Sequence, residues 1–251
     1  MAPARSLTAH YEAFLLTPRP GPGVCATCFN LIHERCFGCS RNEQALARVL
    51  PLSYSVGNEQ LHRALAGYKR IDGTTSRLLG LELSAVAWRF LAMHESCLAG
   101  AAGTDRFDLV TTVPSGDVLR DQRHPLRWVI GELIAPVRDR YERLLERSSV
   151  EVAGRRFSAD KYRPSRRLEG EAVLLIDDTW TTGASAQSAA AALLEGGAGV
   201  VAAVVIGRHI NREWGDNDDR LRALPSFDWQ KCALCSETAA CEGSPVEATA
   251  P

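Results

Sequence analysis

Two short apolar segments flank an alanine-rich segment in the second half of the chain. Residues 172–176 and 200–206 are apolar runs of strand length, and residues 184–194 have the composition of a buried helix that ends at Gly196-Gly197. Strand, helix and strand at this spacing form a βαβ unit, whose strands run parallel because the helix returns the chain to the same end of the sheet. The sequence therefore predicts an α/β fold, with a parallel sheet flanked by helices.

Periodicity predicts further elements before this unit. Apolar residues recur at helical spacing over 58–68 and 74–98, and residues 107–113 form a β-branched run that is typical of a buried strand. Helical spacing then continues from Leu126 to Leu145. Pro136 should interrupt this helix, because proline lacks the N–H group that the helix interior requires.

The residues between the strand at 172–176 and the next helix combine hydrogen-bond acceptors with donors. Asp177 and Asp178 follow the strand directly, at the carboxyl edge where open α/β sheets bind ligands. Gly183 lets the backbone approach a phosphate, and the unpaired N–H groups of the helix start would point at it. Two carboxylates suit the two hydroxyls of a ribose. The segment predicts a ribose 5-phosphate site; the alternative is a capped helix whose aspartates only solvate the sheet edge.

The stretch VLLIDDTWTTGAS, residues 173–185, resembles the signature of type I phosphoribosyltransferases. The resemblance implies their fold, a parallel five-stranded sheet flanked by helices with a hood over the base site. It also implies bound 5-phosphoribosyl-1-pyrophosphate (PRPP), with a Mg²⁺ ion that bridges the ribose hydroxyls and the pyrophosphate. The PRPP-binding residues that it implies are Val113, Pro114, Ser115 and Gly116 in a turn after a strand, and Asp177, Asp178, Thr179, Thr181, Thr182, Gly183, Ala184 and Ser185 in the acidic loop.

The same resemblance implies a transfer reaction, in which a base or amine displaces pyrophosphate at the anomeric carbon. Residues 153–170 are polar, basic and weakly periodic, so we expect a long mobile loop of the kind that the family folds over its substrate. The alternative for its basic residues is a solvated loop. Thr181 stands where some purine-using members carry an acid, which disfavours purine salvage of that type. The residues given catalytic roles are Asp177, Asp178, Arg155, Arg156 and Lys161.

Four cysteines near the N-terminus have the spacing of a structural zinc site. Cys25-x₂-Cys28-x₇-Cys36-x₂-Cys39 forms two knuckles, whose thiolates can surround a Zn²⁺ ion tetrahedrally. The alternative is four reduced cysteines in a hydrophobic core, which we disfavour because this segment is too short for a core.

A cysteine knuckle ahead of such a domain resembles the ComF-like proteins, which are associated with bacterial competence and DNA uptake. Tyr68-Lys69-Arg70 and the basic stretch at 120–127 also resemble that family, although Arg123-His124-Pro125 departs from its usual glycine-aromatic-asparagine sequence. Two functions stay open: a phosphoribosyltransferase, and a non-catalytic module that binds a ribose phosphate or nucleotide. A third hypothesis is contact with competence proteins or with single-stranded DNA, the latter through Arg120, Arg123, Arg127, Arg155 and Arg156.

Three further cysteines, Cys232, Cys235 and Cys241, lie near the C-terminus. They form either a second zinc half-site, or free thiols on a flexible tail. A half-site would be completed by the first knuckle, by a partner chain or by a histidine, for which His33 and His209 are the candidates. Cys97 is expected to be a small buried hydrophobe, and nothing in the sequence assigns a role to His94.

The composition and charge of the chain indicate its class of protein and its expected location. A formal net charge of −1 and 45% hydrophobic residues indicate a soluble globular protein, with no bulk charge that asks for nucleic acid. Without an apolar stretch of membrane-spanning length or a secretory signal in residues 1–10, we expect a cytoplasmic protein, with a homodimer as one candidate assembly. The expected division is an extended lead-in (1–24), a zinc knuckle (25–42), a phosphoribosyltransferase-like domain (43–230) and a cysteine-containing flexible tail (231–251).

Overall fold

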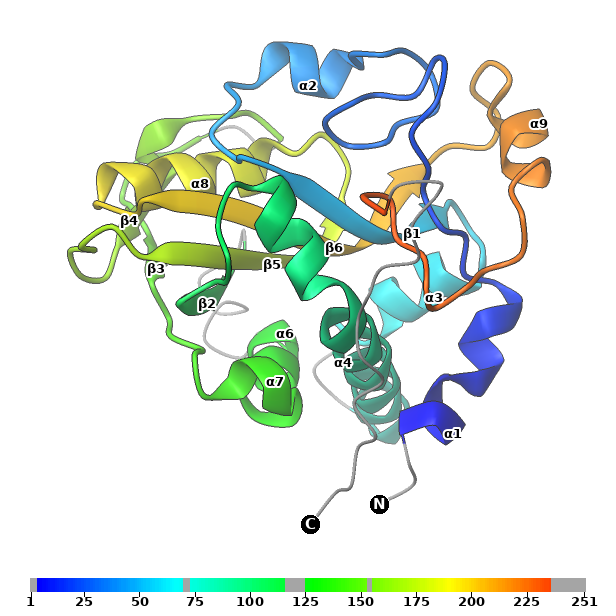
Figure 1. Ribbon diagram of the computed structural model, residues 1–251, viewed down its shortest axis with the longest axis horizontal. Coiled ribbons are helices and arrows are strands. Elements are labelled where there is room, and N and C mark those ends of the chain that lie inside the picture. Colours follow the sequence, from blue (N-terminus) through cyan, green and yellow to red (C-terminus); the bar gives the residue numbers. More distant parts are fainter. Residues whose placement is uncertain (1–3, 70–72, 116–124, 153–154, 236–251) are drawn as a thin grey trace.

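The computed structural model describes residues 4–69, 73–115, 125–152 and 155–235. Its centre is a parallel sheet of four strands in the order β1-β6-β5-β2, as the βαβ pattern predicts (Figure 1). The strands are β1 (Val49–Val56), β2 (Leu109–Thr112), β5 (Ala172–Trp180) and β6 (Val200–Ile210). None of the helices within these described ranges is both long enough and apolar enough to span a membrane.

The resemblance implies five strands, whereas the described residues form four, with a single further bridge at the edge beyond β2. Val110 pairs there with Tyr141, and its N–H and C=O groups bond the backbones of Arg140 and Glu142 at 2.9 Å each. The chain then leaves the sheet to form β3 (Leu145–Arg147). The expected helix over 126–145 is therefore wrong at its C-terminal end. Tyr141 pairs with β2 instead, and Leu145 begins β3.

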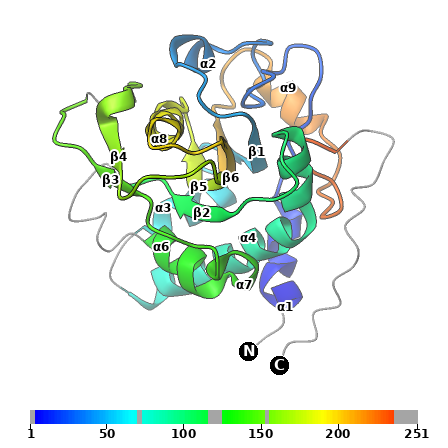
Figure 2. The ribbon, with the colours of Figure 1, turned by 60° about the vertical axis from the view of Figure 1, so that its left-hand side comes forward.

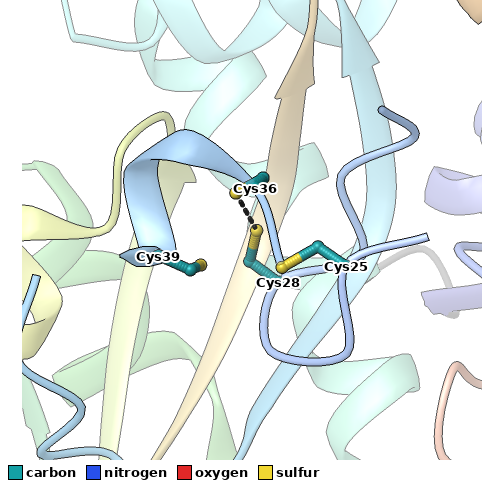
Figure 3. Close-up of side chains that lie close together, drawn as sticks. All are labelled: Cys25, Cys28, Cys36 and Cys39. Carbon is teal, nitrogen blue, oxygen red and sulfur yellow. Dashed lines mark hydrogen bonds between the residues drawn. The ribbon is translucent and has the colours of Figure 1, made fainter. Parts of the chain in front are cut away.

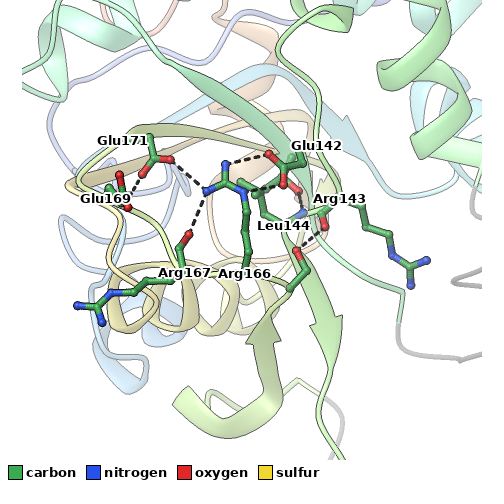
Figure 4. A network of polar contacts seen from close by, with 9 residues as sticks. Glu142, Arg143, Leu144, Arg166, Arg167, Glu169 and Glu171 are labelled. Atoms are coloured by element: carbon green, nitrogen blue, oxygen red, sulfur yellow. Dashed lines mark hydrogen bonds and ion pairs between the residues drawn. The ribbon is translucent and has the colours of Figure 1, made fainter.

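Strand β3 pairs with β4 (Tyr162–Pro164) in an antiparallel ribbon, which corrects the expectation of a mobile loop over all of 153–170. Arg166 anchors the base of this ribbon (Figure 4). Its guanidinium donates two hydrogen bonds to the Glu142 carboxylate, at 2.8 and 2.9 Å, and one to Glu171 at 3.2 Å. These groups are partly exposed, so each pair contributes little, but the fork geometry fixes the ribbon beside the start of β5.

The sheet carries a separate hydrophobic layer on each face, because neighbouring side chains of a strand point to opposite faces. Val173 and Leu175 of β5 pack in one layer with α8 (Ala184–Glu195), and Leu174 and Ile176 pack in the other with α4 (Thr74–Ala101). Figure 2 shows the sheet between α8 on one side and α4, α6 and α7 on the other.

The helices follow the predicted periodicity in most places. α3 (Gln60–Gly67) and α4 confirm the expected helices at 58–68 and 74–98. The expected interruption also occurs: α6 (Pro125–Trp128) continues into a π-helical turn at Val129–Leu133, and a separate α7 (Ala135–Arg138) begins with Pro136 in its first turn. Proline fits that first turn because no intrahelical N–H bond is needed there.

Both chain ends are more ordered than expected. The expected extended lead-in contains α1 (Ala4–Thr8) and a 3₁₀ turn (Ala9–Ala13), which place Tyr11 in the α4 layer. The described part of the expected flexible tail, 231–235, buries Cys232 in the same layer. The described ranges also contain three short helical segments: α2 (Phe37–Arg41), a 3₁₀ turn at Ala159–Lys161, and α9 (Asn217–Arg222).

Candidate functional site

A pocket of about 390 Å³ lies at the carboxyl ends of β2 and β5. These ends meet because Thr112 is in register with Ile176, and the Val113 N–H group donates to the Ile176 carbonyl at 3.1 Å just beyond the pairing. The register therefore brings two segments 64 residues apart (112 and 176) to one edge of the sheet. The pocket is lined by His62, Leu65, Ala66, Lys69, Val113, Pro114, Ser115, Pro125, Asp177, Asp178, Thr179, Thr181 and Ser185.

Asp178 is buried at the base of this pocket and is held by two groups at the end of α3. The Tyr68 hydroxyl donates to its Oδ2 atom, and Lys69 Nζ lies 2.8 Å from its Oδ1 atom. Burying a carboxylate costs several kcal/mol unless it is paired and hydrogen-bonded, and these two contacts supply that compensation. Desolvation and the Asp178 charge raise the pKa of the Tyr68 hydroxyl, so this group remains a donor.

Asp177 is half-buried beside it and has a different environment. Its Oδ1 atom accepts the N–H group of Asp178 at 2.9 Å. Burial, together with the Asp178 carboxylate, raises the pKa of Asp177 to about 7, although the nearby Lys69 and Lys161 act in the opposite direction.

The N-terminus of α8 begins at Gly183, whose left-handed conformation (φ 80°) turns the chain from β5 into the helix. No side chain caps this helix, and the contact from the Ala184 N–H group to Thr182 Oγ1 is long at 3.4 Å. The donors of the first turn and the helix dipole therefore face the region of Thr181 and Ser185, which line the pocket.

Lys161 reaches this helix start from the other side. Its ammonium donates to Ser185 Oγ at 2.9 Å, and burial lowers the pKa of Lys161. The neighbouring backbone is fixed as well, since the Ser158 N–H group donates to Ser188 Oγ at 3.0 Å. A positive charge thus lies beside the uncapped end of α8, an arrangement suited to an anion.

The structure brings some of the predicted site residues together and leaves others apart. Thr182, Gly183 and Ala184 form the turn but do not line the pocket, whereas Arg155 and Arg156 are exposed on the surface. The expected Gly116, and Arg120 and Arg123 of the DNA hypothesis, lie outside the described residues. Sequence reasoning did not place five of the lining residues in this pocket: His62, Leu65, Ala66, Lys69 and Pro125. Of these, Lys69 lies in the family-like Tyr68-Lys69-Arg70 segment and Pro125 lies in the basic stretch at 120–127.

The four N-terminal cysteines form a second candidate site, shown in Figure 3. All four are buried, their sulfur atoms lie within 4.8 Å of one another, and Cys28 Sγ and Cys36 Sγ are 3.6 Å apart. Thiolates around a tetrahedral zinc ion lie about 3.8 Å apart, because the Zn–S bond is about 2.3 Å long. The cluster can therefore hold structural zinc. One premise was wrong: these cysteines do enter a core, the layer on the α8 face.

Arg208 supplies a charge that fits a zinc–thiolate centre. Its guanidinium is buried, donates to the carbonyls of Cys28 at 3.0 Å and Trp180 at 3.2 Å, and has no carboxylate partner among the described residues. A zinc ion with four thiolates carries a formal charge of about −2, which would compensate this buried cation. Arg208 also joins the cysteine knuckle to the end of β5.

The knuckle directly contacts the turn that connects β5 to α8. Asn42 Nδ2 donates to the Thr182 carbonyl at 2.7 Å, and the backbone of Gly38 approaches the same carbonyl so closely that a Cβ atom would lie 3.0 Å from it. Gln187 of α8 accepts the N–H groups of Ala45 and Leu46 at 2.8 and 2.9 Å. The position of the Thr182 turn therefore depends on the knuckle.

A scan against protein-family models, a search of curated proteins and a search of solved structures each returned no match. The functional assignment therefore depends on the pocket and on the loop sequence.

Proposed function

We propose that the pocket at the carboxyl ends of β2 and β5 binds PRPP and that the protein is a phosphoribosyltransferase of the type I class. The observation that carries the proposal is that one pocket is lined by both adjacent aspartates, by the turn after β2 and by residues from the uncapped start of α8. A phosphorylated ribose needs acceptors for its hydroxyls and donors for its phosphate groups at this separation.

Each part of the ligand has a matching group. The 5′-phosphate would bind at the α8 start, with Thr181, Ser185 and Lys161 as its donors. The ribose hydroxyls would donate to Asp177, whose second carboxylate oxygen accepts no hydrogen bond from the described part of the chain. The pyrophosphate would lie against the turn at Val113 to Ser115, near the Lys69 ammonium.

Lys69 could serve pyrophosphate while it holds Asp178, because its side chain is 41% exposed whereas that of Asp178 is 5% exposed. Asp178 would then act mainly by positioning Lys69. Mg²⁺ would arrive with the ligand, neutralising pyrophosphate oxygens, since hard oxygen ligands are those that it prefers.

The reaction would exchange one bond at the anomeric carbon for another. A nitrogen of the base or amine forms a bond to that carbon as the C–O bond to pyrophosphate breaks, and pyrophosphate leaves with the electron pair. The nitrogen then loses its proton to solvent. The protein would act by orienting the two reactants and by stabilising the charge of the leaving group.

Calorimetry with PRPP and with ribose 5-phosphate, each with and without Mg²⁺, tests the proposal. We expect both sugars to bind, and Asp177→Asn to weaken PRPP by at least tenfold because the variant replaces a charged acceptor by a neutral amide. Asp139→Asn is the matched control, since that side chain is 85% exposed and does not line the pocket. Absence of sugar-phosphate binding at millimolar concentration would refute the proposal.

Pyrophosphate release separates the enzyme from the non-catalytic module. Incubation of PRPP with a panel of nucleobases and amines should release pyrophosphate with at least one of them, in an amount that falls in Asp177→Asn. Tight binding of PRPP without release for any acceptor would favour the module that only binds a ribose phosphate or nucleotide.

A further inference from the structure

The C-terminal cysteines meet two residues of α4 that the sequence does not connect to them. His94 Nδ1 and the sulfur atoms of Cys97, Cys232 and Cys235 all lie within 4.8 Å of one another. Cys232 Sγ is 3.3 Å from Cys235 Sγ, and His94 Nδ1 is 3.8 Å from Cys97 Sγ and 4.0 Å from Cys235 Sγ. In a tetrahedral zinc site the thiolates lie about 3.8 Å apart, with the imidazole nitrogen about 3.6 Å from each. The observed distances bracket these values.

The hydrogen bond of His94 leaves the correct nitrogen available. His94 is fully buried, and its Nε2 atom lies 2.8 Å from the Trp229 carbonyl oxygen. A carbonyl can only accept, so the proton is on Nε2 and the lone pair is on Nδ1, which faces the three sulfur atoms. Metal-bound histidines are generally oriented by such a bond from their second nitrogen.

In each half of the cluster, the local backbone structure brings two ligand side chains together. His94 and Cys97 are three residues apart on α4 and so lie on the same face of the helix. Cys232 and Cys235 form a turn in which the Cys235 N–H group donates to the Cys232 carbonyl at 3.2 Å. The Cys232 N–H group donates to Cys235 Sγ, also at 3.2 Å.

Cys235 is disulfide-bonded in this structure, so it can serve as a ligand only after reduction. We infer that, in the reduced protein, His94, Cys97, Cys232 and Cys235 form a second structural zinc site. Three thiolates and one imidazole in tetrahedral reach are a common ligand set for this ion. The metal would fasten the segment after Trp229 to α4, across 135 residues of sequence, and so hold the C-terminal part of the described chain on the α4 face. His33 and His209, the candidates named from sequence, are not part of the cluster.

Metal analysis of the full chain, purified under reducing conditions, tests the site. We expect about two zinc ions per chain, and one in His94→Gln and in Cys235→Ser, with the secondary structure unchanged by circular dichroism. Cys241→Ser is the matched control, because it removes the third tail cysteine, which lies outside the described residues. Loss of a zinc ion in Cys241→Ser would overturn the ligand set.

Zinc-edge X-ray absorption on the unmodified protein identifies the zinc ligands directly, so this second test does not depend on the folding of a variant. Two sites together should show sulfur ligands with a minor imidazole contribution, whereas the first cluster alone would show sulfur only. One zinc ion per chain without an imidazole signal would overturn the inference. So would iron in place of zinc, or fewer than eight reactive thiols in the denatured, metal-stripped protein, which would indicate a disulfide in place of a ligand.

Discussion

Gly183 determines whether β5 can turn into α8, and its replacement by alanine tests how this turn is built. A Cβ atom at Gly183 would lie 2.1 Å from Cζ2 of Trp180 and 2.5 Å from Cε2. Trp180 is 1% exposed, so its ring has no open space into which it can move. Alanine must therefore adopt the left-handed conformation at φ 80° and also displace a buried indole.

The two costs can be separated by magnitude. The left-handed conformation costs a non-glycine residue roughly 1–2 kcal/mol. Overpacking of a filled core typically costs a further 1–3 kcal/mol, so Gly183→Ala should lower the free energy of unfolding by about 2–5 kcal/mol. Gly170→Ala is the matched control, because Gly170 has φ 93° with no atom within 4 Å of the added Cβ. It should show the conformational cost alone.

A double-mutant cycle with Trp180→Leu isolates the overlap. Trp180→Leu removes the clashing ring, so Gly183→Ala in that background should cost only about as much as Gly170→Ala. The coupling energy from urea unfolding should then be about 1–3 kcal/mol, in the direction that the double variant is more stable than additivity predicts. Coupling within roughly 0.5 kcal/mol of zero would refute the packing of Trp180 beneath the turn.

Two further predictions concern charge. Because the pKa of Asp177 is raised from 3.8 to about 7, its ionisation opposes folding over that range, and a sugar that needs the ionised carboxylate should bind roughly tenfold more tightly at pH 8 than at pH 6. Calorimetry across this range should show a flatter profile in Asp177→Asn, because the Asp177 carboxylate no longer contributes to it. An unchanged profile would contradict the shift. Arg208→Met should lower the free energy of unfolding by about 3 kcal/mol in zinc-loaded protein and by less after chelation, since the guanidinium compensates the zinc–thiolate charge. Equal losses with and without zinc would refute that compensation.

The sequence predicts the βαβ unit well because its signals are local. An unbroken apolar run, two acids, a glycine turn and an alanine-rich helix specify β5 and α8 within a few residues. The sequence does not predict the register with β2, because pairing across 64 residues of sequence (109 with 173) is set by packing of the layers and not by any residue in the loop.

Strand β1 was not predicted, and Pro51 accounts for the difficulty. Proline cannot donate to a sheet ladder, so it argues against a strand in the interior of a sheet. β1 is an edge strand that pairs with β6 alone, and there a missing N–H group can face away from the partner. Whether a strand lies at an edge is a property of the whole topology, and the local sequence does not contain it.

Contacts between segments far apart in the chain could not be predicted from the sequence either. Tyr68 and Lys69 meet Asp178 about 110 residues later, and His94 meets the tail cysteines across 138 or more residues. No periodicity links such partners, because each belongs to a separate element whose position is fixed by the hydrophobic layers. The cysteine spacing at 25–39 was informative only because all four ligands are local.

The two cysteine clusters occupy opposite faces of the same sheet, and this arrangement gives them different consequences. The first belongs to the α8 layer and contacts the Thr182 turn through Asn42 and Gly38, so its metal would hold the α8 end of the pocket in place. The second belongs to the α4 layer, near the C-terminal end of that helix, and none of its residues lines the pocket. Its metal would therefore stabilise the fold without shaping the ligand site. Both ends of the described chain would then be fastened by metal, and the carboxyl edge between the two layers would remain open to the sugar phosphate.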